Sequence, residues 1–291
     1  MSAHTRREFL AGAAAGMVAG ARPLSAMTQT ATPSGPGFPI EDYHVHLNAM
    51  TIDQVAAISK ETGVKYGVIE HCGTKDNEYP IVLSTDKDLQ DWIARLQGKG
   101  VYIGVQAEWI DWPGCFSKEV FSQLDYVLTD SWTVRDANGK RIKAFSREYD
   151  PGNDAEAFMK WYVEWIIEIL ETTPLDIWSH PMWVTRKFSP QLEQMWTEER
   201  MRRVVATLKN TNTAVEIDSS VRLPTMPFLK LAKAEGIKFC FGASSQGARI
   251  NPVDWSIATA KELGLTRQDM FQPAPRGRKP IQVRKIQARA R

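Results

Sequence analysis

Residues 43–47 read Tyr-His-Val-His-Leu, a stretch in which three apolar residues alternate with two histidines, just after Glu41-Asp42. Strict alternation of this kind predicts a β-strand. Side chains two positions apart on a strand point to the same side, so we expect His44 and His46 to face one surface together.

Short apolar segments and amphipathic segments alternate through the rest of the chain. Strands are predicted at 43–47, 66–70, 102–107, 126–128, 175–178, 214–217 and 238–241. Helices are predicted at 52–61, 86–97, 118–124, 155–171, 198–209, 227–234 and 252–263. This order predicts an α/β fold of parallel βα units, and the pattern alone allows an open sheet or a closed barrel. Asn138-Gly139 within 133–145 predicts a surface hairpin.

The composition is that of a globular protein, with 291 residues of which 43% are hydrophobic and 24% charged. It excludes a disordered chain, a collagen-like fibre and a disulfide-dense scaffold. Three cysteines allow at most one intrachain disulfide. The net charge of +2 hides basic ends, because residues 41–271 hold 26 basic and 33 acidic side chains, a net of −7. An acidic body argues against nucleic acid as a partner.

The N-terminus contains Thr5-Arg6-Arg7-Glu8-Phe9-Leu10, then a small-residue apolar run over 11–21 and Leu24-Ser25-Ala26. This resembles a twin-arginine export signal, which implies the twin-arginine export machinery as a partner and a periplasmic or secreted protein. The apolar run is short and rich in Ala and Gly, so no stable membrane span is expected after processing.

These features divide the chain into four parts. We predict a signal peptide over 1–26, a linker over 27–40, a barrel domain over 41–271 and a basic disordered tail over 272–291.

Polar side chains fall where the predicted strands end, which is where βα folds place their chemistry. His71 ends the second strand, Glu108 the third and His180 the fifth. A single histidine at a strand end is more often a hydrogen-bonded structural residue than a ligand. The joint placement of His44, His46 and these residues favours a divalent transition metal site. Glu216 is either a pocket carboxylate or a buried partner that orients His180, and the second role is favoured.

Aromatic residues also gather at the predicted strand ends. Trp109, Trp132 and Trp183 are candidates for binding a ring-containing substrate, or they pack loops over the barrel. Arg249 follows the seventh strand and is a candidate for an anionic group, with a solvated arginine as the alternative. Cys72 follows His71 directly, and a metal ligand, a disulfide partner of Cys115 and an inert small residue are all open for it.

The order of these motifs resembles the PHP (polymerase and histidinol phosphatase) family of metal-dependent hydrolases. The matching segments are Asp42-Tyr43-His44-Val45-His46, Val68-Ile69-Glu70-His71, 102–108, Asp125-Tyr126-Val127, Trp178-Ser179-His180-Pro181 and Phe241-Gly242. The resemblance implies a distorted seven-stranded (βα) barrel, similar to a TIM barrel. It places His44, His46, His71, Glu108 and His180 on metal-ligand positions of the family.

Several family ligands are replaced in this chain. Ser244 and Gln246 stand where the family usually has an aspartate and a histidine, and Trp132 stands about where another histidine is expected. A neutral serine supplies no charge to a divalent cation. The resemblance therefore implies fewer than three ions of zinc, manganese or iron, with one metal held by His44, His46 and Glu108 and with His180 sharing it or positioning substrate.

The predicted function is that of an exported, metal-dependent, phosphoesterase-like hydrolase that uses metal-activated water on a small molecule. His71 or His180 would handle a proton. Two alternatives stay open: a catalytically degenerate barrel that binds a glycan or another ring-containing ligand, and an amidohydrolase-type carbonyl or lactone hydrolase.

Overall fold

The computed structural model describes residues 37–136 and 138–275. The predicted signal peptide, most of the predicted linker and most of the predicted tail lie outside these residues. Within the described residues, no helix is both long enough and apolar enough to cross a membrane.

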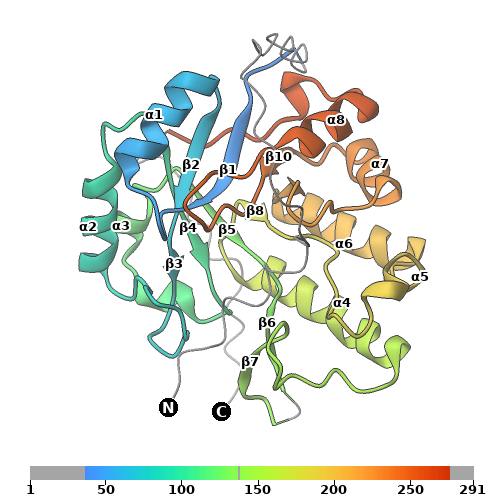
Figure 1. The fold of residues 1–291 in the computed structure, drawn as a ribbon. Helices are drawn as coiled ribbons and strands as arrows, with labels where there is room; N and C mark the ends of the chain where they lie inside the picture. Colours follow the sequence, from blue (N-terminus) through green and yellow to red (C-terminus); the bar gives the residue numbers. More distant parts are fainter. Residues whose placement is uncertain (1–36, 137, 276–291) are drawn as a thin grey trace, which may run out of the picture. The chain divides into compact units, whose positions relative to one another are not determined.

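Parallel strands form a closed barrel, which confirms the predicted fold class (Figure 1). Its strands are β1 (Glu41–His46), β2 (Lys65–Ile69), β4 (Tyr102–Ala107), β5 (Tyr126–Thr129), β8 (Ile177–Trp178), β9 (Ala214–Asp218) and β10 (Phe239–Gly242). They pair in the order β2-β1-β10-β9-β8-β5-β4, and pairing of β2 with β4 closes the ring. The short β3 (His71–Cys72) follows β2 after Glu70 and pairs with β4. Closure leaves the parallel ladder without an open edge between β2 and β4.

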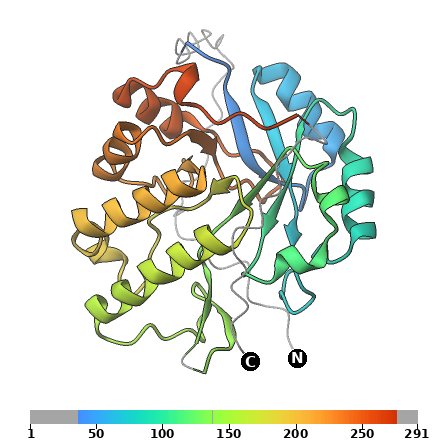
Figure 2. The same cartoon turned by 180° about the vertical axis from the view of Figure 1, so that it is seen from behind.

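Helices surround the strands on the outside, as both views show (Figures 1 and 2). They are α1 (Ile52–Thr62), α2 (Asp86–Leu96), α3 (Lys118–Phe121), α4 (Ala155–Thr172), α5 (Leu192–Met195), α6 (Glu198–Thr211), α7 (Met226–Ala234) and α8 (Asp254–Leu263). Three short 3₁₀ turns lie at Trp112–Cys115, Ser189–Gln191 and Arg267–Asp269. Local sequence sets the ends: Thr51 and Gln54 form a capping box at the start of α1, and Gly63 ends that helix at φ 71°.

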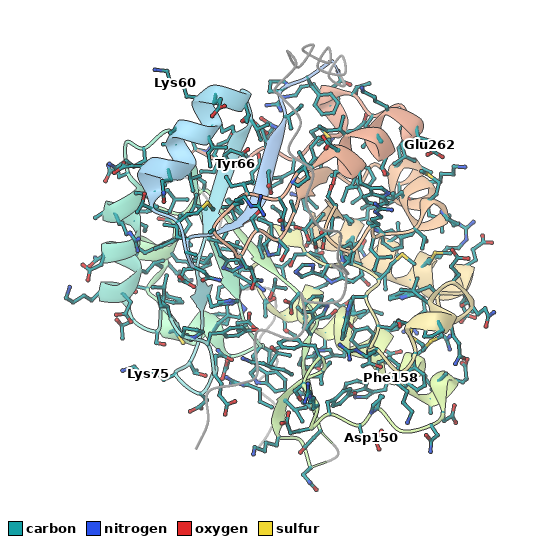
Figure 3. All side chains as sticks on the ribbon, viewed as in Figure 1. Lys60, Tyr66, Lys75, Asp150, Phe158 and Glu262 are labelled. Carbon is teal, nitrogen blue, oxygen red and sulfur yellow. The ribbon has the colours of Figure 1, made fainter. Side chains whose placement is uncertain are left out.

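Two apolar layers lie on either side of the barrel wall. The outer layer joins strands to helices and includes Val45, Val105, Trp178 and Phe241. A smaller inner cluster draws one or two residues from each of six strands, namely Tyr43, Ile69, Tyr126, Leu128, Ile177, Ala214 and Cys240. Lys60 and Glu262 illustrate the exposed charged side chains at the periphery (Figure 3).

Most predicted elements occur within a few residues of their expected bounds. The hairpin is confirmed as β6 (Thr133–Arg135) paired antiparallel with β7 (Arg141–Lys143). The fifth barrel strand is shorter than predicted, because only Ile177 and Trp178 pair with both neighbours. Sequence patterns did not reveal β3 or α5, which have two and four residues and are too short to show a periodicity.

The ring of Tyr126 fills the barrel interior against two glycines. A Cβ on Gly104 would lie 2.4 Å from Cζ of Tyr126, and one on Gly67 would lie 2.4 Å from its hydroxyl oxygen. The Tyr126 hydroxyl donates to the carbonyl of Tyr43 at 2.7 Å, so the ring is held and has no easy way to move aside.

Gly104→Ala is therefore expected to lower the free energy of unfolding by roughly 1–3 kcal/mol, the usual cost of overpacking a filled core. Urea denaturation measures the change. Gly114→Ala is the matched control, because a Cβ there meets nothing within 4 Å. Equal stability of the two variants would show that Tyr126 does not fill the interior as described.

Candidate metal centre

Four histidines and six carboxylates are buried at the carboxyl ends of the barrel strands, a region called the mouth from here on. They are His44, His46, His71, His180, Asp42, Glu70, Glu108, Asp130, Glu216 and Asp218. The imidazoles form a row: the ring centroids are 4.8 Å apart for His71 and His46, 5.5 Å for His46 and His44, and 4.8 Å for His44 and His180. The structure thus brings together all the histidines that the sequence placed at strand ends.

Strand β1 supplies the centre of the row through an irregular stretch. Its pairing with β2 shifts register between Asp42 and Val45, which is the signature of a β-bulge and re-aims the side chain of His44. The Nδ1 atom of His44 lies 2.7 Å from Oε1 of Glu216, and its Nε2 has no hydrogen-bond partner within 37–136 and 138–275. Both ring nitrogens of the fully buried His46 also lack a partner among the described residues.

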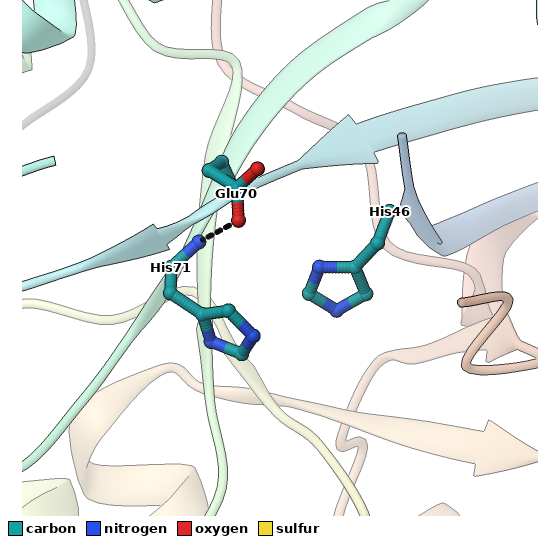
Figure 4. Close-up of side chains that lie close together, drawn as sticks. All are labelled: His46, Glu70 and His71. Atoms are coloured by element: carbon teal, nitrogen blue, oxygen red, sulfur yellow. Dashed lines mark hydrogen bonds between the residues drawn. The ribbon is translucent and has the colours of Figure 1, made fainter. Parts of the chain in front are cut away.

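The break between β2 and β3 positions a second part of the mouth. Glu70 lies at this break, and its Oε1 accepts a hydrogen bond from the backbone N–H of His71 at 3.0 Å (Figure 4). The Nδ1 of His71 lies 2.9 Å from Oε1 of Glu108, whose Oε2 accepts from the Thr133 hydroxyl at 2.9 Å. Ligand atoms of His46, Glu70 and His71 all lie within 4.8 Å of one another, close enough to share one ion.

The opposite side of the mouth is built around His180. Its Nδ1 lies 2.5 Å from Oδ2 of Asp218, and its backbone N–H donates to Oε2 of Glu216 at 2.7 Å. Asp218, and not Glu216, therefore orients the His180 ring, which corrects the expectation from sequence. His180 has a left-handed backbone with φ 45°, a strained conformation for a residue with a side chain. His180, Glu216 and Asp218 form a second group of ligand atoms within 4.8 Å.

Burial sets the charge states of the mouth. It raises the pKa values of Asp42, Glu108 and Asp130 to about 7, because a carboxylate loses its hydration there. Burial also holds the pKa of His46 well below its usual value, with the neighbouring imidazoles His71 and His44 as further causes. Burial lowers the pKa of His180 too, but Asp218 outweighs that effect and the pKa stands at about 9.

The remaining predicted site residues fall in different surroundings. The ring of Trp132 stacks on His180 with centroids 4.2 Å apart, and it also contacts Trp183 at 4.8 Å. Trp109 packs against Trp165 at 5.0 Å, under the hairpin arginines. Arg249 is exposed on the loop that follows β10. Cys72 lies in the outer apolar layer, and Cys72, Cys115 and Cys240 are all free thiols.

Sequence reasoning assigned no role to several carboxylates of the mouth. Glu70 and Asp42 stand inside the quoted motifs, and Asp218 lies two residues after Glu216, so that both face one side of β9. Asp130 directly follows β5, and it accepts from the Gln106 side chain at 3.0 Å. The strand-end rule that found Glu108 applies equally to Asp130.

Fold and site together define a class: a closed (βα) barrel whose mouth holds imidazoles and carboxylates in the pattern of a metal centre. No protein-family model matches the chain, and no curated protein matches its sequence. Among solved structures, the barrel is similar to a histidinol phosphate phosphatase from Lactococcus lactis subsp. lactis Il1403, solved with zinc, L-histidinol and phosphate. The identity is 16%, the TM-score is 0.51, and the match covers 77% of this chain and 92% of that one.

A second solved structure is an HpcH/HpaI aldolase from Desulfitobacterium hafniense DCB-2. It has 15% identity and a TM-score of 0.35, and covers 72% of this chain and 86% of that one. At these identities the likeness concerns the fold alone.

Asp218→Asn tests the electrostatics of the mouth. Loss of the carboxylate removes the group that stabilises the His180 cation, while burial still disfavours it, so the pKa of His180 should fall from about 9 to the ordinary 6.5 or lower. The imidazole is followed by ¹⁵N NMR in metal-free protein. Asp53→Asn, whose exposed carboxylate bonds Lys99, is the control. An unchanged titration in Asp218→Asn would contradict the pairing.

Proposed function

We propose that this chain is an exported metal-dependent hydrolase of the phosphoesterase type. The observation that carries the proposal is the pair of buried histidines on β1. Three of their four ring nitrogens have no hydrogen-bond partner among the described residues. Buried polar atoms are normally paired, and an unpaired imidazole nitrogen among carboxylates has the chemistry of a metal ligand.

The residues present fit a divalent transition metal. His46, Glu70 and His71 are the best-placed group, with Nε2 of His44 in the next ring of the row. Carboxylates at the Nδ1 atoms of His44 and His71 fix the ring orientations, as the outer-shell partners of metal-bound histidines do. Imidazole and carboxylate ligands together suit zinc, manganese or iron. When bound, such a metal would activate a water molecule and polarise the phosphoryl group.

His180 is the residue we assign to proton transfer. Asp218 at its Nδ1 favours the protonated ring, and the raised pKa keeps a proton there at neutral pH. A protonated imidazole can donate from Nε2 to the oxygen of a leaving group, which is general acid catalysis. This role agrees with the crowding of His180 by Trp132, because a stacked aromatic ring fixes the imidazole plane.

The zinc-bound phosphatase supports the phosphoesterase form of the proposal. The match covers most of this chain, and that protein was solved with zinc and phosphate. A degenerate, ligand-binding barrel is the second candidate, favoured by the ring contacts among Trp132, Trp183 and Phe145 beside His180. A carbonyl hydrolase would use the same metal on another bond.

Metal content decides between these candidates. Elemental analysis of the purified protein should find on the order of one transition metal per chain, and a chelator should abolish hydrolysis of p-nitrophenyl phosphate. His46→Ala should lose the metal, because that ring offers two unpaired nitrogens to the mouth. Asp91→Ala on the exposed face of α2 is the control.

The outcomes separate the three readings. Bound metal with chelator-sensitive hydrolysis of p-nitrophenyl acetate, but not of the phosphate ester, would indicate the carbonyl hydrolase. A folded wild-type protein that takes up no metal would favour the ligand-binding barrel.

Export is tested separately in cells. Replacing Arg6 and Arg7 with lysine should retain the precursor in the cytoplasm, because the twin-arginine machinery reads the arginine pair. Fractionation and immunoblotting follow the mature form. Undiminished mature protein in the periplasm would reject this route.

A further inference from the structure

The β6–β7 hairpin turns a charged face toward the mouth. Thr133 pairs directly with Lys143, and Arg135 pairs with Arg141. Directly opposed side chains of an antiparallel pair lie on one face of the ribbon. The hydroxyl of Thr133 reaches Glu108, so this is the face that looks into the mouth and Lys143 shares it.

Arg141 fixes the hairpin to the loop between β3 and α2. Its guanidinium donates to Thr74 Oγ1 at 3.0 Å, to Asn77 Oδ1 at 2.8 Å and to Asp111 Oδ2 at 2.5 Å. A planar fork with three oxygen partners resists displacement. The position of Lys143 beside the same loop is therefore built into the fold.

Lys143 extends this contact to the histidine row. Its ammonium donates to the carbonyl of Glu78 at 2.8 Å and lies 3.4 Å from the ring centroid of Tyr79. The Tyr79 ring stacks on His71 at 3.6 Å with an interplanar angle of 13°. Cation, aromatic ring and imidazole thus form one stack that ends at a predicted metal ligand.

The positive charge of this stack would help an anionic substrate to bind in an acidic mouth. Six buried carboxylates make the mouth repel anions, and an anionic substrate needs local positive charge to enter it. The charges of Lys143 and Arg141 already act inside the mouth, because both lower the pKa of Glu108 against the larger effect of burial.

We propose that Lys143, seated on Tyr79, forms an anion-binding subsite beside His71 that selects phosphate monoester dianions over neutral esters. The proposal rests on the proposed function and adds the substrate class. The hairpin is the element that carries this selectivity. Tyr79 is a positioning residue, since it holds the ammonium against the His71 ring.

Binding of inorganic phosphate to the full chain with its native metal tests the subsite. Lys143→Met keeps the stem and removes the charge, and isothermal titration calorimetry should show phosphate affinity about tenfold weaker, as expected for one lost charge-assisted contact. Lys143→Arg should retain most of the affinity. Lys140→Met, exposed at the turn of the same hairpin, should match wild type. Elemental analysis should show equal metal content in all four proteins.

Two further measurements separate the subsite from its supports. Tyr79→Leu removes the ring under the ammonium and should weaken phosphate binding as Lys143→Met does. Lys143→Met should raise KM for p-nitrophenyl phosphate and leave p-nitrophenyl acetate hydrolysis unchanged.

Each result has one meaning. Unchanged phosphate affinity in Lys143→Met overturns the subsite even where the enzyme hydrolyses phosphate esters. Equal losses of hydrolytic activity on the phosphate ester and the acetate ester also overturn it, because Lys143 would then support the fold and not phosphate binding. Phosphate binding that depends on Lys143 without any hydrolysis supports the subsite and rejects the hydrolase.

Discussion

The carboxylate of Glu216 is the contact on which the arrangement of the mouth depends. One oxygen lies 2.7 Å from Nδ1 of His44 on β1, and the other accepts from the backbone N–H of His180 after β8. One side chain on β9 thereby fixes two imidazoles from two other strands. The neighbouring strand β10 makes room for it with Gly242, where a Cβ would lie 1.8 Å from Oε1. A glycine at this position is a condition for the histidine row, and any side chain there would displace Glu216 and release His44.

Charge is the second constraint, because burial opposes the ionisation of so many carboxyl groups in one place. Asp42, Glu108 and Asp130 have pKa values near 7, so the mouth takes up protons at neutral pH unless positive charge replaces them. A divalent cation does this more effectively than protonation, since it also satisfies imidazole nitrogens that have no hydrogen-bond partner in the described part of the chain. Metal affinity should therefore rise with pH as ligands lose their protons. Backbone strain is also found where the strands end: Trp109, His180 and Ser244 all have left-handed backbones at or just after strand ends.

The fold was readable from the sequence because alternating apolar strands, amphipathic helices and strand-end polar residues all agree. His44 and His46 mark the mouth by spacing, and Asn138-Gly139 marks the hairpin. The partners within the mouth were not readable, because they depend on the bulge in β1 and on the break at Glu70, which shift side chains without any sequence period. The partner of His180 illustrates this: Glu216 and Asp218 both lie on one face of β9, and only the register with β8 and β10 decides which carboxylate reaches the His180 ring.

The two sides of the mouth differ in a way that bears on the number of metals. Beside His180 the ring of Trp132 stacks on the imidazole and Trp183 packs on Trp132, and Ser244 supplies no charge from the β10 loop. The acids Glu216 and Asp218 are already engaged there by His44, by His180 and by Ser220. Beside His71 the ligand atoms of His46 and Glu70 converge, and the hairpin brings Lys143 to the same place. A cation binds most tightly where unpaired ligand atoms meet. An anionic substrate binds most tightly where further positive charge adjoins that cation. Both arguments select the His46–His71 side for metal and phosphate.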